Sequence, residues 1–193
     1  GVSLQIFILV IVFVASLFTG MGVLVARFAG AAEPDKVNRC VYQAFLVTVV
    51  LAAGVMAPIG YWLSPTLLGL INAAPEVQVE ALPYIRILFM FSIGMLMFYM
   101  FSGALRAAGD AKTPMRLGIF MTVLNVVLNI VLIRGLGPIP AFGTRGAAMG
   151  TAIASGITGA VFMWLLFSDR LVIRFSRSMS FRPDWAIIRS LFR

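Results

Sequence analysis

The sequence TVLNVVLNIVLI, residues 122–133, is a run of aliphatic side chains interrupted by two amides, Asn125 and Asn129. Residues four apart lie on one face of an α-helix, so the two amides share a face, and Thr122 extends it by about one turn. The other residues of the segment are valine, leucine and isoleucine. We therefore predict a membrane-spanning helix over residues 115–133 with one narrow polar stripe on an apolar surface.

The composition of the whole chain is typical of a membrane protein. Hydrophobic residues make up 61% of the 193 residues and charged residues 11%, whereas a soluble domain carries about 25% charged residues. The chain has one cysteine, Cys40, and no histidine, so it can form no internal disulfide, and a His/Cys metal site is not expected. The net charge of +8 comes from basic residues between apolar segments. This pattern is typical of basic loops on the cytoplasmic side of a membrane protein, and we prefer that interpretation to a surface that binds nucleic acid.

Five segments are apolar over about 20 residues, the length that a helix needs to cross a bilayer. Thr113 is the predicted N-cap of the fourth segment, with Pro114 at its first helical position, and Pro83 suits the first turn of the third. These features predict an all-α fold, a polytopic helix bundle of residues 1–169 in the membrane. The five predicted spans are about residues 2–26, 41–63, 84–105, 115–133 and 146–167.

The charges between the spans alternate along the chain. Residues 27–39 and 106–116 carry net positive charge, whereas residues 64–82 hold two glutamates and no lysine or arginine. Because basic loops stay in the cytoplasm, residues 170–193 are predicted to be a basic cytoplasmic tail, with the N-terminus outside. No signal peptide is visible in the apolar run that follows Gly1. An outside N-terminus then favours a fragment that lacks one upstream helix.

No predicted span holds an aspartate or glutamate at mid-depth, where ion pathways and proton relays place carboxylates. The deep polar groups are hydroxyls and amides, and Gln43 is among them. The last span is rich in small residues, and Gly146 and Gly150 form a GxxxG pattern that lets helices approach closely. We expect its neighbour to be the span 115–133, because the connection between the two is short.

Two interpretations of Asn125 and Asn129 remain open from the residues alone. The amides can hydrogen-bond to a neighbouring helix and fix its packing, an interaction that contributes on average under about 1 kcal/mol. Alternatively, together with Thr122, they can line a site for a cation or a drug inside the bundle, because amide oxygens are suitable ligands for hard cations such as Na⁺.

Five motifs follow one another in a characteristic order and spacing: GVLVARFAGAAEPDKVNRCVYQA, ALPYIRI, GALRAAGDAKTPM, NVVLNIVLI and GLGPIPAFGTRGAAMGTAIAS. Together they resemble the N-terminal lobe of the multidrug and toxic compound extrusion (MATE) family, from its second helix to its sixth. The resemblance implies twelve helices in two six-helix lobes, which export organic cations or drugs by alternating access in exchange for Na⁺ or H⁺. The first helix and the second lobe are then missing, and residues 170–193 are the link between the lobes.

The resemblance also implies the residues of a cation site in this lobe. Asn125 matches an asparagine on the family's fifth helix, and Thr151 matches a small or hydroxyl residue on the sixth. Asn129 stands where many members have aspartate, so one negative charge is missing. A carboxylate on the family's first helix, outside this chain, is then the main coupling group. No cofactor is expected other than the coupling ion, Na⁺ or H⁺.

The implied partners are small organic cations, the lipid bilayer and the remaining helices of the same transporter, in a multi-pass protein of the bacterial inner membrane. A lipid-linked oligosaccharide flippase of the same superfamily is an alternative, but we expect several arginines or lysines in such a cavity, and this chain has none at mid-depth. An inert truncated half that binds nothing alone is a third interpretation. An enzyme is not expected, because the chain offers no histidine and no facing carboxylates.

Overall fold

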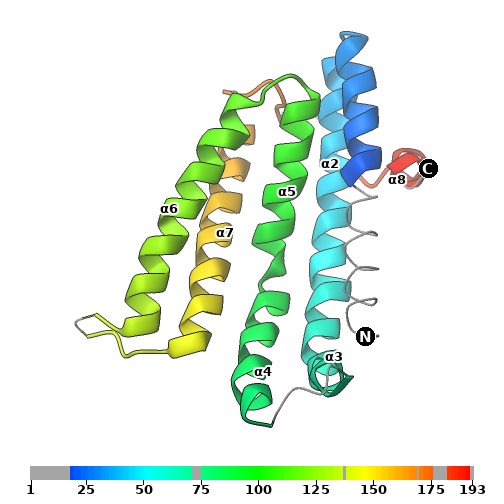
Figure 1. The fold of residues 1–193 in the computed structure, drawn as a ribbon. Helices are drawn as coiled ribbons and strands as arrows, with labels where there is room; N and C mark the ends of the chain where they lie inside the picture. Colours follow the sequence, from blue (N-terminus) through cyan, green and yellow to red (C-terminus); the bar gives the residue numbers. More distant parts are fainter. Residues whose placement is uncertain (1–17, 71–74, 137, 169, 176–181, 192–193) are drawn as a thin grey trace.

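The computed structural model describes residues 18–70, 75–136, 138–168, 170–175 and 182–191, and among these it contains helices and no β-strand (Figure 1). The predicted all-α fold class is therefore confirmed. The helices, in chain order, are Phe18–Gly30, α2 (Pro34–Val50), η1 (Leu51–Met56), α3 (Ala57–Leu70), α4 (Pro75–Met90), α5 (Ser92–Ala107), α6 (Lys112–Arg134), α7 (Gly143–Phe167) and α8 (Trp185–Leu191).

Within the described residues, three helices are long and apolar enough to cross a membrane, and the bent pair α4–α5 makes a fourth candidate. The three are Pro34–Thr66, Lys112–Arg134 and Gly143–Phe167. Of the first predicted span, residues 2–17 lie outside the described part of the chain. The rest belongs to a shorter apolar helix, Phe18–Gly30, which continues four residues beyond the predicted end at residue 26.

The second span starts earlier than residue 41, the predicted beginning. Its helix begins with α2 at Pro34, because proline in the first turn has no N–H to leave unpaired and its φ angle already suits a helix. The helix then passes through η1, a π-helical stretch, before continuing as α3. A π-helical turn widens the helix and shifts the faces of the flanking segments relative to each other.

The third span is not the single helix that we predicted for residues 84–105. The helix begins at Pro75, so Pro83 lies in its interior, and our assignment of Pro83 to the first turn was wrong. At Phe91 the backbone leaves helical geometry, with φ −104° and ψ 20°. The segments on either side, Gln78–Met90 and Ser92–Ala107, meet at an angle of 50°.

The N-cap position of α6 is Ala111, so our assignment of the N-cap to Thr113 was wrong, and the side chain that caps the helix belongs to Asp110, one residue before the N-cap. One carboxylate oxygen of Asp110 accepts hydrogen bonds from the backbone N–H groups of Lys112 at 3.1 Å and Thr113 at 3.0 Å. Partial burial raises the pKa of Asp110, but the hydrogen bonds from Thr113 and Lys112 and the nearby charge of Arg116 outweigh it. They hold the pKa below its usual value. A carboxylate here satisfies N–H groups that have no partner within the helix.

This cap predicts a pH-dependent stability. Because the pKa of Asp110 is lowered by folding, its contribution is present above the ordinary carboxyl pKa and is lost as the pH falls through the folded-state value. Asp110→Ala should lower the free energy of unfolding by about 1 kcal/mol near neutral pH, and the difference from wild type should shrink in acid. Asp110→Asn keeps an acceptor oxygen, so near neutral pH it should lose less stability than Asp110→Ala, and the pH dependence should disappear. Thermal unfolding of the purified chain at several pH values checks both results, and equal stability of Asp110→Ala at neutral pH would contradict the cap.

The helices form a row in which each packs along its neighbour (Figure 1). α6 packs along α7, as expected from their short connection; α7 also packs along α4 and α5, and α5 packs along α2. The main hydrophobic core lies between α2, α5 and α7 and includes side chains of the segment that follows α7. Residues assigned to a cytoplasmic tail thus contribute to the core. They are Leu171, Ile173, Phe175 and, from α8, Leu191.

Candidate functional site

The interface between α6 and α7 depends on two glycines of α7. A Cβ atom on Gly146 would overlap the carbonyl oxygen of Leu132, and a Cβ atom on Gly150 would overlap the side-chain oxygen of Asn129. Both glycines are buried. The predicted GxxxG pattern therefore does bring the helices together, and its second glycine leaves the space that the amide of Asn129 occupies.

At this interface three of the predicted site residues form one hydrogen-bond chain. The Nδ2 atom of Asn129 donates to Oδ1 of Asn125 at 3.0 Å, and the Nδ2 atom of Asn125 donates to Oγ1 of Thr151 at 3.1 Å. The Thr151 hydroxyl in turn donates to the carbonyl oxygen of Ala147 in its own helix, at 3.1 Å. Each donor leads on to the next residue of the hydrogen-bond chain, and the bond from Asn125 to Thr151 is the one of the three that passes from α6 to α7.

The hydrogen-bond chain begins at Asn129, and the side-chain oxygen of this residue receives no hydrogen bond from any described residue. Among the described residues, Oδ1 of Asn129 is buried and has no hydrogen-bond partner. A buried acceptor without a donor costs about 1–3 kcal/mol. Because the amide nitrogen of Asn129 is already used, this oxygen is free to receive a proton donor or to contact a cation. The site therefore contains one unused ligand atom.

Thr122 does not join this chain. The residue is exposed on α6, and its hydroxyl donates to the carbonyl oxygen of Gly118 in the same helix at 2.9 Å. The regular spacing placed Thr122 on the polar stripe, but Asn125 and Asn129 turn toward α7 whereas Thr122 lies outside the interface. Among the described residues, no hydrogen bond joins Thr122 to Asn125 or Asn129.

The arrangement can contribute to a cation site but cannot form one alone. Hard cations take several oxygen ligands, six to eight for Ca²⁺, and this interface offers one free amide oxygen with the hydroxyl of Thr151 nearby. Across the described residues, no group of three or more His, Cys, Asp or Glu side chains could hold a metal ion. Additional ligands would have to come from parts of a protein that the described residues do not include.

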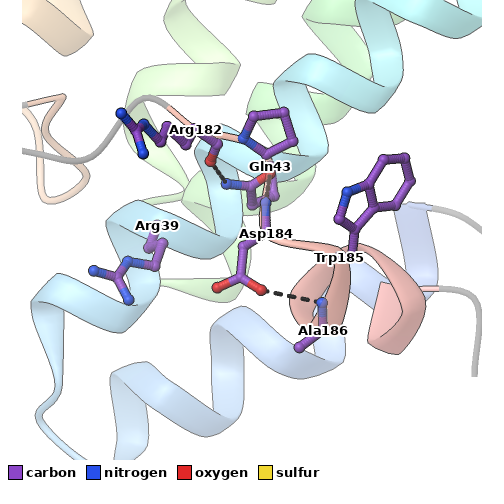
Figure 2. Close-up of a pocket in the computed structure, with 7 residues that line it drawn as sticks. Arg39, Gln43, Arg182, Asp184, Trp185 and Ala186 are labelled. Carbon is purple, nitrogen blue, oxygen red and sulfur yellow. Dashed lines mark hydrogen bonds between the residues drawn. The ribbon is translucent and has the colours of Figure 1, made fainter.

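A second polar contact, between the middle of α2 and the segment before α8, was missed by sequence reasoning (Figure 2). Gln43 is 0% exposed. Its Nε2 atom donates to the carbonyl oxygen of Arg182 at 2.9 Å, and its Oε1 atom accepts from the backbone N–H of Asp184 at 3.1 Å. Gln43 therefore attaches the segment before α8 to the bundle. The only signal in the sequence was an amide within an apolar helix, which does not reveal a partner 139 residues away.

Comparison with known proteins decides the family. The MatE family model matches residues 1–131, more than half of the chain. The chain belongs to the MatE family. This result confirms the resemblance inferred from the five sequence motifs, one of which carries both Asn125 and Asn129.

Relatives within the MatE family are described as multidrug resistance proteins. The chain is 30% identical over 173 residues to "Probable multidrug resistance protein YoeA" of Bacillus subtilis (strain 168), a match that covers 90% of this chain and 37% of the relative. It is 29% identical to "Probable multidrug resistance protein NorM" of Thermotoga maritima, covering 86% of this chain and 36% of that protein. The chain thus spans little more than a third of the length of these MatE relatives.

The fold also matches solved MatE-type structures. One is an inward-facing conformation of a multidrug resistance MATE family transporter of the MOP superfamily, with a TM-score of 0.81 and 24% identity over 96% of this chain and 41% of that chain. The outward-facing conformation of such a transporter matches with a TM-score of 0.79 and 23% identity, over 98% of this chain and 42% of that chain. The helix bundle described above therefore has the fold of about two fifths of each of these solved chains.

Proposed function

We propose that this chain is part of a cation-coupled antiporter of the bacterial inner membrane that exports small organic cations or drugs by alternating access. In this proposal Asn125, Asn129 and Thr151 belong to the site of the coupling ion, Na⁺ or H⁺. The observation that carries the proposal is the buried, unpartnered Oδ1 atom of Asn129 at the end of the hydrogen-bond chain. A bound cation or a proton donor from another helix would satisfy this oxygen and recover the free energy that its burial costs.

The direction of the hydrogen-bond chain supports a site rather than packing alone. Asn125 already provides an amide bond across the interface of α6 and α7 by donating to Thr151. Asn129 adds no further bond to α7, since its nitrogen donates within α6. An amide that fixed packing only would use both its groups, whereas Asn129 leaves its oxygen available beside Gly150.

Alternating access requires more than this bundle. Transporters of this kind rock two repeats against each other around a central site, and the chain spans 37% of the first relative. α6 presents an exposed apolar face that a second lobe or the lipid bilayer would cover. This face contains Ile119, Phe120, Val123, Val126, Val127 and Ile130. The bundle matches inward- and outward-facing structures almost equally well, which supports movement of the lobe as a unit.

The test uses a complete transporter that carries this lobe, expressed in a drug-sensitive bacterial strain. Asn129→Leu and Thr151→Val should each abolish resistance, because the first removes the oxygen that contacts the cation and the second removes the hydroxyl that positions Asn125. Expression should stay near normal, because interhelical amide bonds contribute under about 1 kcal/mol to folding. Thr158→Val is the matched control. Its hydroxyl, buried in the same helix, donates only to the carbonyl oxygen of Ala154, and its removal should leave resistance intact.

Asn129→Asp separates the two interpretations more sharply. An ionised carboxylate at this position would face Oδ1 of Asn125 without a hydrogen to donate, so it would need a proton or a cation. Transport by this variant should persist and should depend more strongly on pH or Na⁺ than transport by the wild type. Full resistance with Asn129→Leu, or an Asn129→Asp variant with unchanged ion dependence, would show that the asparagines are structural.

A further inference from the structure

Two arginines and a tryptophan surround a depression at the junction of α2 and α8, away from the asparagine chain. The depression has a volume of about 350 Å³ and is open to the surface; Arg39, Gln43, Arg182, Asp184 and Trp185 are among the residues that line it. Figure 2 shows the side chains of Arg39 and Arg182 both on the side of Asp184 that faces away from Trp185. Arg39 comes from α2, and the other surface residues come from the segment that leads into α8.

Gln43 fixes the geometry of this depression. By bonding the carbonyl oxygen of Arg182 and the N–H of Asp184, it holds the backbone on both sides of Pro183 against α2. The position of Arg182 relative to Arg39 is therefore set by a buried contact and not by a mobile tail. Such preorganisation lowers the ordering cost of binding a ligand between the two side chains.

The charged side chains that line the depression are Arg39, Arg182 and Asp184, so its net charge is positive. The carboxylate of Asp184 accepts hydrogen bonds from the N–H groups of Ala186 at 3.0 Å and Ile187 at 3.4 Å, at the start of α8. Among the residues that the structure describes, the one ion pair within 4.0 Å joins Lys36 and Glu33. Neither Arg39 nor Arg182 therefore has a carboxylate partner among them at this distance. Guanidinium groups free of partners suit phosphate, which they can bind through two parallel hydrogen bonds.

Beside the two arginines, α8 has the composition of a segment that lies at a bilayer surface. Trp185 is 77% exposed, and with Ile188 and Arg189 it borders a second open depression. Tryptophan is enriched where the hydrocarbon of a membrane meets its headgroups. Figure 1 shows α8 beside α2 and turned across it, the orientation of a helix that lies along a surface. An exposed tryptophan next to unpaired arginines fits a ligand with an apolar body and an anionic head.

We propose that the surface formed by Arg39, Arg182, Trp185 and Arg189 binds an anionic phospholipid, with the phosphate between Arg39 and Arg182 and the acyl chains against Trp185. The lipid would anchor α8, and with it the segment held by Gln43, to the membrane surface. This inference does not depend on the proposed cation site, because none of its residues contacts Asn125, Asn129 or Thr151.

The test uses Trp185 as the reporter. The substitutions Trp62→Phe and Trp164→Phe leave Trp185 as the only tryptophan, and the 193-residue chain is placed in nanodiscs of phosphatidylcholine and phosphatidylglycerol. Bromine, which quenches tryptophan fluorescence at short range, is carried by the acyl chains of one lipid or the other at equal mole fraction. We expect stronger quenching by brominated phosphatidylglycerol than by brominated phosphatidylcholine.

Substitution of the arginines should remove this preference. Arg39→Gln and Arg182→Gln should each lower the enrichment of phosphatidylglycerol about five-fold, the change that corresponds to about 1 kcal/mol per basic residue at an anionic surface. Arg134→Gln and Arg145→Gln, exposed arginines near the α6–α7 connection, are the matched controls and should leave it unchanged. Inorganic phosphate at constant ionic strength should not displace the lipid.

Three results would overturn the proposal. Equal quenching by the two lipids would show that the surface has no preference for negative charge. A lack of quenching by either lipid would show that Trp185 does not contact the acyl chains of the bilayer. Loss of the preference on addition of inorganic phosphate would identify a site for a free anion, in which the acyl chains have no part.

Discussion

Replacing Gly94 with alanine is expected to separate α5 from α7 and to destabilise the whole bundle. A Cβ atom on Gly94 would lie 2.6 Å from the backbone nitrogen of Gly156 and 2.7 Å from the carbonyl carbon of Ser155. The clash is with backbone, so no change of rotamer can relieve it, and the helices must move apart. Overpacking costs up to about 3 kcal/mol, which exceeds the gain of about 1 kcal/mol in helix propensity. Thermal unfolding of the purified chain in detergent measures the loss.

The same contact supplies the control. A Cβ atom on Gly156 would meet nothing within 4 Å, although its backbone touches Gly94. Gly156→Ala should therefore leave stability unchanged or raise it by up to about 1 kcal/mol, because alanine is the better helix former. If Gly94→Ala and Gly156→Ala unfold at the same temperature, the close approach of α5 and α7 is not needed for the fold.

Removing the ring of Phe175 should have an effect of similar size, although this residue follows the last predicted span. Phe175 is 3% exposed. Its ring centroid lies 5.6 Å from that of Tyr42, 5.8 Å from that of Phe167 and 6.4 Å from that of Phe101. Truncation of a buried phenylalanine costs about 3–5 kcal/mol. Phe175→Ala should lower the midpoint of thermal unfolding and should make the preceding residue, Arg174, more accessible to trypsin in the native state.

Val172→Ala is the matched control for this prediction. Val172 lies in the same segment and is 59% exposed, so its truncation should change the free energy of unfolding by no more than about 0.5 kcal/mol. Unchanged stability and unchanged trypsin resistance of Phe175→Ala would mean that the segment after α7 is an appended tail. The expected difference between Phe175 and Val172 would instead make it part of the lobe, closing the end of the core between α2 and α7.

The candidate site shows how far periodicity reaches. The spacing of Asn125 and Asn129 correctly placed two amides on one face of a helix, and the resemblance added Thr151 from another helix; the structure joins these three residues in one hydrogen-bond chain. Thr122 fits the same spacing and stays outside. A helical repeat defines a stripe, but the width of the contact with α7 determines which residues of the stripe are buried. The free oxygen of Asn129 could not be predicted, because it depends on the direction of both amides.

Hydropathy determined from the sequence alone where α6 and α7 lie along the chain, whereas the helix-terminal residues that we assigned, Pro83 and Thr113, were wrong. In lipid a backbone N–H or C=O group has no water to bond to, and a helix pairs these groups within one segment. The apolar segments therefore form α6 and α7, with ends within a few residues of those predicted. Contacts between distant segments were decided only by the tertiary structure. The bend at Phe91, the attachment of Arg182 by Gln43 and the burial of Phe175 all depend on where other backbones pass. Hydrogen bonds and hydrophobic contacts act over a few ångströms, and which groups come that close is a property of the packed bundle.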